Sequence, residues 1–263
     1  MMSEQCRMYE KVLIDYEENG KKYEIINRLY PMSDTGKFIE DSYEQALIAL
    51  FRDELGYDYE YGYDVERDVR EPYHRADLEA SLRKLNPQCK PGVIAEAIRK
   101  LTNISEGTLL QNNERFIQWL QGGMEVSYQE LGETRTALLR LVDYLDIRQN
   151  TFKVVNQWTV DEIAKKRCDM VVMLNGLPVV VIELKSATAE NATVEDAYKQ
   201  IKNYQQVLPT LFAYNAFNVI SDMGETKAGT LTSSLNRYMD WKTVDGNTES
   251  TLLADYRTFF LGI

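Results

Sequence analysis

Two apolar runs, at residues 169–174 and 179–184, flank an Asn-Gly pair and constrain this chain more than any other feature. The first run opens on Asp169, whereas the second carries Glu183 near its end and is followed by Lys185. Successive apolar residues are typical of central strands covered on both faces, and an Asn-Gly pair between such runs predicts a tight β-hairpin. Because an unpaired buried charge costs several kcal/mol, this arrangement requires a compensating partner, such as a metal ion, or a function.

Whether the two acids can act together depends on the register of this hairpin. A strict two-residue turn pairs Leu174 with Leu177, which sets Asp169 opposite Ile182 and points it away from Glu183. An odd-length loop or a β-bulge instead sets Asp169 opposite Glu183. A shared site therefore predicts an irregularity in the hairpin.

Two converging carboxylates and the backbone carbonyl of Leu184 would offer the hard oxygen ligands that Mg²⁺ prefers. Such an ion acidifies a water molecule and stabilises charge on a phosphoryl oxygen. Lys185 is suited to position the attacking water or to neutralise the developing charge. The hypothesis is metal-assisted phosphodiester hydrolysis, and the alternative reading of the same spacing is a salt bridge at the end of a strand.

Length, charge and cysteine content restrict the possible classes of protein. The 263 residues suffice for one large domain or two small ones. The net charge is −11, whereas a free-standing nucleic-acid binder usually presents a basic surface, so contact with DNA would need a local patch, metal ions or a partner. Three distant cysteines without a CxxC pattern indicate a reduced protein without a zinc site. With neither a signal peptide nor a bilayer-spanning apolar run, we expect a cytoplasmic protein that contacts no membrane.

Apolar periodicity and capping signals predict an α/β protein with a mixed sheet. Ser42 with Gln45, and Thr193 with Asp196, have capping-box spacing, and each pair begins an expected helix. The expected helices cover residues 41–55, 76–85, 91–101, 109–120 and 193–207. The expected strands cover residues 151–160, 169–174, 179–184 and 215–222.

Tyrosines recur at every second position from Tyr57 to Tyr63, which places them on one face of an extended segment. Such a ladder can stack on nucleic-acid bases or pack across strands, and packing is the favoured interpretation. His74 is the only histidine, and we interpret it as a surface or packing residue rather than as a catalyst or ligand.

The D-x13-E-x-K spacing around a hydrophobic hairpin resembles the PD-(D/E)xK nuclease superfamily, although Cys168 stands where a proline is usual. The stretch "DMVVMLNGLPVVVIELKSA" further resembles the N-terminal nuclease domain of the R (motor) subunit of type I restriction enzymes. Four more blocks agree in order and extend the resemblance over roughly residues 40–260: "SYEQALIALFRDELGYDY", "NNERFIQWLQGGMEVSY", "AYNAFNVISDMGETKAGTL" and "WKTVDG".

The resemblance implies a restriction-endonuclease-like α/β fold, in which a mixed β-sheet is flanked by helices. It implies that Asp169 and Glu183 hold the metal ion and that Lys185 is the catalytic base or charge stabiliser. It also suggests a catalytic acid on the first helix, for which Glu44 is the candidate because it lies beside the apolar stripe. Alternatively, Glu44 is a solvated residue stabilised by the helix dipole, and Glu54 also falls within the stripe.

Substrate-binding candidates come from two further places. RecB-type relatives carry Gln-x3-Tyr on the helix after the E-x-K strand, and Gln200 and Tyr204 match this pattern on one helical face. By this resemblance Gln200 would hold a phosphate or orient Lys185, with Tyr204 supporting the site; a buried polar pair is the alternative. A basic cluster precedes the first acid and comprises Lys165, Lys166 and Arg167. Together with Lys199 and Lys202 it would form a local DNA-binding patch or, alternatively, a solvated face.

The resemblance implies one nuclease domain over residues 1–263, divided into an extension at 1–40, a mostly helical part at 41–150, a catalytic core at 151–225 and, at 226–263, the start of a connection to a motor. No G-x4-G-K-[ST] phosphate loop is present, so ATP would act only through that motor and we expect no ATPase activity from this chain.

The expected function is that of a type I site-specific deoxyribonuclease domain, an Mg²⁺-dependent endonuclease. Its expected partners are double-stranded DNA and the modification and specificity subunits of a restriction complex. The alternative is a non-catalytic docking module that keeps a nuclease-like fold.

Overall fold

The structure, a computed structural model, describes residues 11–18, 21–28, 40–185, 193–222 and 225–240. Much of the expected N-terminal extension, and the expected connection beyond Asp240, therefore lie outside the described residues. Strands β1 and β2 form a separate antiparallel pair at Lys11–Glu18 and Lys21–Arg28.

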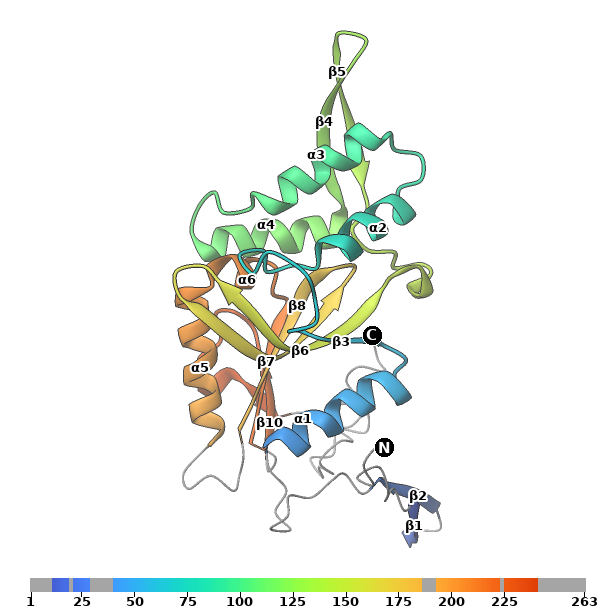
Figure 1. Ribbon diagram of the computed structural model, residues 1–263, viewed down its shortest axis with the longest axis vertical. Coiled ribbons are helices and arrows are strands. Elements are labelled where there is room, and N and C mark those ends of the chain that lie inside the picture. Colours follow the sequence, from blue (N-terminus) through green and yellow to red (C-terminus); the bar gives the residue numbers. More distant parts are fainter. Residues whose placement is uncertain (1–10, 19–20, 29–39, 186–192, 223–224, 241–263) are drawn as a thin grey trace, which may run out of the picture.

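A seven-stranded mixed sheet forms the centre of the described part of the chain (Figure 1), in the order β11-β10-β9-β8-β7-β6-β3. The β3–β6 and β8–β9 pairs are parallel and the others are antiparallel. The strands are β3 (Asp58–Tyr61), β6 (Phe152–Asp161), β7 (Lys165–Leu174), β8 (Leu177–Leu184), β9 (Phe217–Ser221), β10 (Thr226–Gly229) and β11 (Met239–Asp240). Every residue of β8 is buried, as expected for a central strand.

Different helices cover the two faces of this sheet. On one face Leu47 of α1 belongs to the same apolar cluster as Val172 of β7, and on the other Ile201 of α5 belongs to the cluster of Val171. The helices are α1 (Glu40–Ala49), α2 (Arg75–Leu85), α3 (Pro91–Thr102), α4 (Leu109–Gly122), α5 (Val194–Val207) and α6 (Pro209–Ala213). The chain therefore has the restriction-endonuclease-like α/β fold expected from the resemblance, a mixed sheet flanked by helices.

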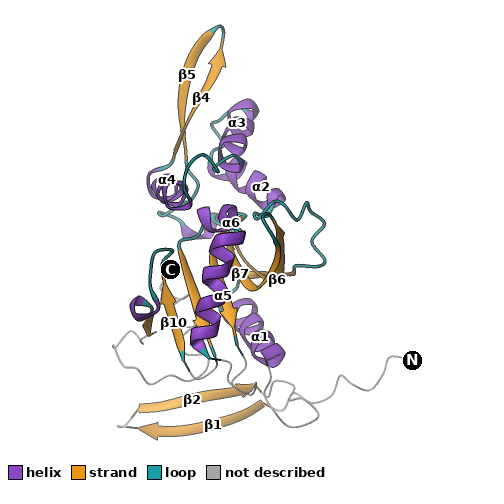
Figure 2. Ribbon diagram, turned by 90° about the vertical axis from the view of Figure 1, so that its left-hand side faces the viewer, coloured by secondary structure: helices purple, strands orange, loops and turns teal. Residues whose placement is uncertain are grey.

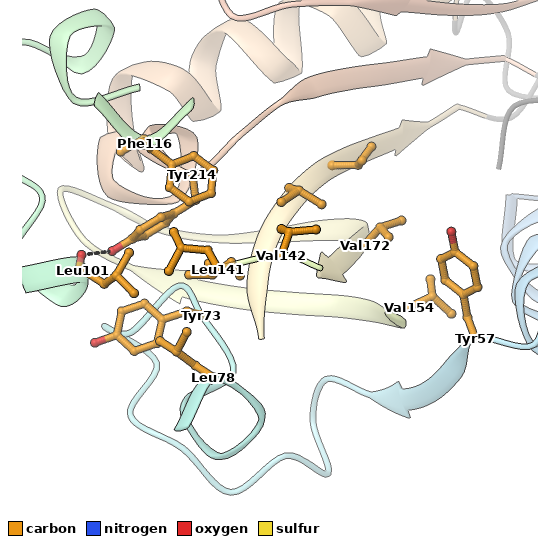
Figure 3. Close-up of a cluster of buried hydrophobic side chains, with 14 of the residues drawn as sticks. Tyr57, Tyr73, Leu78, Leu101, Phe116, Leu141, Val142, Val154, Val172 and Tyr214 are labelled. Carbon is orange, nitrogen blue, oxygen red and sulfur yellow. Dashed lines mark hydrogen bonds between the residues drawn. The ribbon is translucent and has the colours of Figure 1, made fainter. Parts of the chain in front are cut away.

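Helices α2, α3 and α4 lie beyond one end of the sheet, and from them a long hairpin projects away from the body (Figures 1 and 2). This hairpin comprises β4 (Met124–Glu130) and β5 (Glu133–Leu139). Tyr214, after α6, joins this layer to the sheet: its hydroxyl donates to the Leu101 carbonyl at 2.8 Å (Figure 3), and its ring meets those of Phe116 and Tyr73 edge-on. Sequence reasoning missed the hairpin.

The helix signals were accurate to within a few residues, with one exception at α1. This helix begins at Glu40, so Ser42 lies inside its first turn and is not the N-cap. It continues as a π-helix over Leu50–Glu54, and Gly56 follows with φ +73°. By contrast, the capping box of Thr193 and Asp196 is confirmed at the start of α5.

The tyrosine ladder divides into a packed half and an exposed half. Tyr57 is buried against Phe152, and the Tyr59 hydroxyl donates to Asn156 Oδ1 at 3.1 Å. Tyr61 and Tyr63 pair their rings 5.3 Å apart on the surface, where Tyr63 is 57% exposed. The packing interpretation therefore holds for the first two tyrosines only.

His74 is a largely buried residue at the start of α2. Its Nδ1 accepts a hydrogen bond from the backbone N–H of Asp77 at 3.3 Å, which caps the helix. Its Nε2 lies 3.1 Å from Glu60 Oε2. The side chain thus has a structural role at this position, in line with the packing interpretation.

Candidate active site

The turn of the central hairpin is a strict two-residue turn. Leu174 pairs with Leu177, and both Asn175 (φ 52°) and Gly176 (φ 81°) have left-handed backbones, as a type I′ turn requires. The turn is fixed in place: the His74 N–H donates to the Gly176 carbonyl at 2.8 Å. By parity, such a turn alone would set the two acids on opposite faces.

A β-bulge further along the hairpin reverses this parity. Met173 pairs with Pro178 but Val172 pairs with Val180, so Val179 is the extra residue. The Val179 carbonyl accepts the N–H of Ala216 at 2.7 Å, which holds the bulge from the neighbouring chain segment. The irregularity that a shared site predicts is therefore present, within the hairpin rather than in its turn.

Beyond the bulge the register continues to Met170 opposite Ile182, so the next residues along are Asp169 and Glu183. Asp169 Oδ2 accepts the backbone N–H of Leu184 at 2.8 Å. Lys185 Nζ donates to Glu183 Oε1 at 2.6 Å and to the Leu184 carbonyl at 3.1 Å. The structure thus brings together the two acids, the lysine and the carbonyl that the sequence singled out.

The surroundings of the Glu183 carboxyl disfavour its ionised form. The residue is only 1% exposed, and burial raises its pKa to about 8, with the nearby charge of Asp169 acting in the same direction and Lys185 opposing both. Its second oxygen, Oε2, is buried without a hydrogen-bond partner among the described residues. Such an atom is costly in a dry interior and is well suited to bind a cation.

The ligand set suits Mg²⁺ better than a metal held entirely by side chains. No group of three His, Cys, Asp or Glu side chains in the described part of the chain could hold a metal ion. Two carboxylates and one carbonyl are present instead, and Mg²⁺ commonly takes one or two carboxylates and fills its other positions with water and substrate oxygens. Asp169, Glu183 and Leu184 therefore fit this ion.

Glu44 of α1 is buried at 5% exposure, so it is not a solvated helix-start residue, whereas Glu54 is exposed. Asn156 Nδ2 donates to Glu44 Oε1 and Gln157 Nε2 donates to Oε2, each at 2.6 Å. A carboxylate held at both oxygens by hydrogen bonds is well ordered. Burial and ordering support the choice of Glu44, and its catalytic role stays a prediction.

Tyr204 faces the site from α5, where it is almost fully buried. Its hydroxyl donates to the Arg167 carbonyl at 2.7 Å. Burial and then the charge of Glu183 raise its pKa above the ordinary value, and a hydrogen bond with Gln200 opposes them. Gln200 and Tyr204 thus interact, as their shared helical face predicts, and Tyr204 lies close enough to Glu183 to respond to its charge.

The basic cluster before the first acid is partly engaged with the protein itself. Lys165 and Arg167 are exposed and Lys166 is half-buried. Arg167 donates to the Tyr63 hydroxyl at 2.8 Å. On α5 the other two lysines bind neighbours: Lys199 pairs with Asp196 at 2.7 Å, and Lys202 donates to the Leu231 carbonyl at 3.0 Å. The cluster at 165–167 therefore remains the better candidate for a DNA contact.

Sequence reasoning missed Asn156 and Gln157, which hold Glu44. Their signal is visible in the sequence, because two carboxamide residues interrupt an otherwise apolar strand, "VVNQW". Polar side chains at such positions require buried partners, and Glu44 is that partner.

Comparison with known proteins gives the family. A sequence model described as "Type I restriction enzyme R protein N terminus" matches residues 37–237. The chain belongs to this family. Within the R protein family, the chain is 33% identical over 211 residues to the type I restriction enzyme HindI endonuclease subunit of Haemophilus influenzae. The aligned region covers 76% of this chain and 20% of that protein. It is 30% identical over 203 residues to the putative MjaIXP endonuclease subunit of Methanocaldococcus jannaschii, covering 73% and 19%.

The chain spans about a fifth of the length of these R protein relatives. A shorter match, 36% identical over 90 residues, is to the SsaAORF53P endonuclease subunit of Staphylococcus saprophyticus. In the residues that the structure describes, no helix has the length and apolar character needed to cross a membrane.

Proposed function

We propose that this chain is the Mg²⁺-dependent DNA endonuclease domain of a type I restriction R subunit, which hydrolyses phosphodiester bonds. The observation that supports this most is the bulged hairpin, which aligns Asp169 with Glu183 and leaves Glu183 Oε2 without a hydrogen-bond partner among the described residues. The names of the relatives, all endonuclease subunits of type I restriction enzymes, agree with it.

In this proposal Asp169, Glu183 and the Leu184 carbonyl hold the ion. When bound, Mg²⁺ supplies an acidified water and stabilises charge on the phosphoryl oxygen. Lys185 exchanges its contact with Glu183 for one with the attacking water or the non-bridging oxygen, where a compact cation stabilises developing charge. Glu44, held by its two amide donors, acts in this proposal as a catalytic acid and not as a ligand of the ion.

The substrate in this proposal is double-stranded DNA. The chain carries a net charge of −11, so its own attraction to phosphates is weak. Lys165, Lys166 and Arg167 provide a local contact next to Asp169, and Gln200 binds a phosphate from α5. Modification and specificity subunits, together with the ATP-driven remainder of the R subunit, would supply the rest of the grip on DNA.

The test is nicking of plasmid DNA by the assembled restriction complex carrying Lys185→Ala. We expect a loss of at least about 100-fold, because removing one charge stabiliser from a buried site commonly costs that much. Lys227→Ala is a matched control: Lys227 has the same 23% side-chain exposure as Lys185 and also pairs with an acid, Glu225, at 2.7 Å, but it lies on β10.

If Lys185→Ala cuts as well as the parent complex, the catalytic assignment is wrong and a non-catalytic docking module becomes the better interpretation. Calorimetric titration with Mn²⁺ checks the metal site separately. We expect binding heat with the parent chain and none with Asp169→Ala.

A further inference from the structure

Gln157 has an unusual backbone for its position. Three non-glycine residues of the described chain have positive φ, and two of them, Leu131 and Asn175, lie in two-residue hairpin turns. Gln157 (φ 54°) instead lies in the middle of β6. A left-handed non-glycine residue costs roughly 1–3 kcal/mol and persists only where its surroundings impose it, often at functional sites.

At Gln157 the alternation of side chains along β6 reverses, so that residues before and after it point to opposite faces of the sheet from those expected. Val154 and Trp158 would share a face of a regular strand, yet they belong to the apolar clusters on opposite sides of the sheet. The same reversal occurs on β7, where Cys168 and Met170 are two residues apart but belong to the clusters on opposite faces of the sheet. The register pairs Trp158 with Cys168 and Asn156 with Met170, which leaves Gln157 directly across from Asp169. The inversion is therefore centred on a proposed metal ligand.

The inversion also explains how two neighbours reach one carboxylate. Adjacent residues of a regular strand point to opposite faces, but Asn156 and Gln157 both donate to Glu44, at 2.6 Å to each oxygen. Only the left-handed backbone of Gln157 brings both carboxamides to the same side. Because carboxamides are neutral donors, they orient the carboxylate without cancelling its charge.

The surroundings hold this conformation in place. The Gly62 N–H donates to the Asn156 carbonyl at 2.9 Å. A Cβ on Gly62 would lie 2.7 Å from the carbonyl oxygens of both Asn156 and Gln157, so only glycine permits this approach. The Tyr59 hydroxyl donates to Asn156 Oδ1, which fixes the first carboxamide as well.

We infer that Gln157 is a positioning residue, whose strained backbone fixes the Glu44 carboxylate beside Asp169 and thereby strengthens binding of the divalent ion. This inference rests on the proposed function. It assigns the strain in β6 to metal affinity rather than to stability of the fold. A variant that relieves the strain and removes the carboxamide should therefore lose metal affinity without an equal loss of stability.

The experiment compares Gln157→Gly with the parent 263-residue chain. Glycine accepts positive φ without strain, which offsets the loss of the hydrogen bond to Glu44, so we expect the melting temperature of the metal-free chain to stay close to that of the parent. We expect the dissociation constant for Mn²⁺, measured by calorimetry, to rise about tenfold, the lower end of the range for residues that surround the ligands of a metal site. Leu131→Gly is the matched control, because Leu131 has φ 53° but is 96% exposed at a hairpin tip. It should change the melting temperature similarly and leave Mn²⁺ binding unchanged.

A second comparison asks whether Gln157 acts through Glu44. In a Glu44→Gln background, Gln157→Gly should weaken Mn²⁺ binding no further, since residues that act as one unit give non-additive effects. If the two changes are additive, the assignment to Glu44 is wrong. Gln157→Asn tolerates the left-handed backbone but has a shorter side chain, so it should behave like Gln157→Gly and provides the same comparison if the glycine variant melts far below the parent.

The outcomes separate this inference from the proposed function. If Asp169→Ala abolishes Mn²⁺ binding while Gln157→Gly binds as tightly as the parent, the positioning role is overturned and the metal site stands. If Asp169→Ala retains the parent binding heat, the metal site fails, and the inference fails with it.

Discussion

At the scale of single residues, the Glu183 carboxylate is the most unfavourable charge of the site, because it is buried next to a second acid, Asp169. Its pKa of about 8, against an ordinary value of 4.5, means that folding favours the protonated form. Stability from this group is therefore fully present below pH 4.5 and is lost as the pH rises through about 8. A bound cation would relieve the same cost, so the strain is consistent with a site built for metal.

Glu183→Gln should accordingly stabilise the metal-free chain at high pH. A neutral amide avoids the burial of charge, so the difference in free energy of unfolding between variant and parent should grow between pH 5 and pH 8.5, on the order of 2–4 kcal/mol. Thermal or urea unfolding in EDTA at several pH values measures it. A difference that stays constant with pH would mean that Glu183 titrates normally in the folded chain.

At the scale of elements, two hairpins with the same turn type occupy different environments. Gly176 (φ 81°) and Gly132 (φ 84°) both follow a left-handed residue in a two-residue turn. A Cβ on Gly176 would lie 2.4 Å from the backbone nitrogen of Leu78, whereas one on Gly132 would meet nothing within 4 Å. The turn of the central hairpin therefore packs closely against α2, whereas the turn of the projecting hairpin is open to solvent.

Gly132→Ala should lower the free energy of unfolding by about 1 kcal/mol, the cost of a left-handed alanine. Gly176→Ala adds a clash with backbone that cannot move aside, and it should cost at least about 3 kcal/mol. Urea unfolding of both variants gives the comparison. Equal losses would show that the contact between the turn and α2 adjusts freely, and that the position of the central hairpin does not depend on it.

The elements also show what the sequence could predict. Long apolar runs and capping signals identified β6, β7, β8 and the helices, since each buries a periodic face. The β4–β5 hairpin was missed although β4 alternates between buried and exposed residues. Its partner β5 is exposed over its first four residues and shows no apolar face of its own. For the site, parity required an irregularity near Asp169, but it could not say whether the loop or a bulge provides it. Gln157 has a left-handed backbone (φ 54°) where Gly62 closely approaches its carbonyl and Glu44 accepts its carboxamide. No local sequence pattern encodes these tertiary contacts.

At the scale of the whole molecule, an acidic protein is proposed to cut a polyanion. A net charge of −11 disfavours approach to DNA at long range, so contact depends on the few cations near the site. Lys165 and Arg167 are exposed immediately before Asp169, and screening limits the reach of the acidic surface to about 10 Å at ordinary ionic strength. A short basic segment at the site can therefore bind phosphate even though the molecule as a whole repels it.

The double variant Lys165→Ala, Lys166→Ala tests this local contact. Each phosphate contact contributes about 0.9 to the slope of log K against log salt, so we expect the slope for duplex DNA to fall by about 1–2, measured by fluorescence anisotropy with the assembled complex in EDTA. Lys84→Ala, Lys90→Ala removes two positive charges near α2 and α3 instead, where Lys84 donates to the Gln149 carbonyl at 2.7 Å and Lys90 pairs with Glu130. It leaves the same overall charge, so an equal change in slope for both double variants would mean that DNA responds to the net charge of the chain and not to a contact beside Asp169.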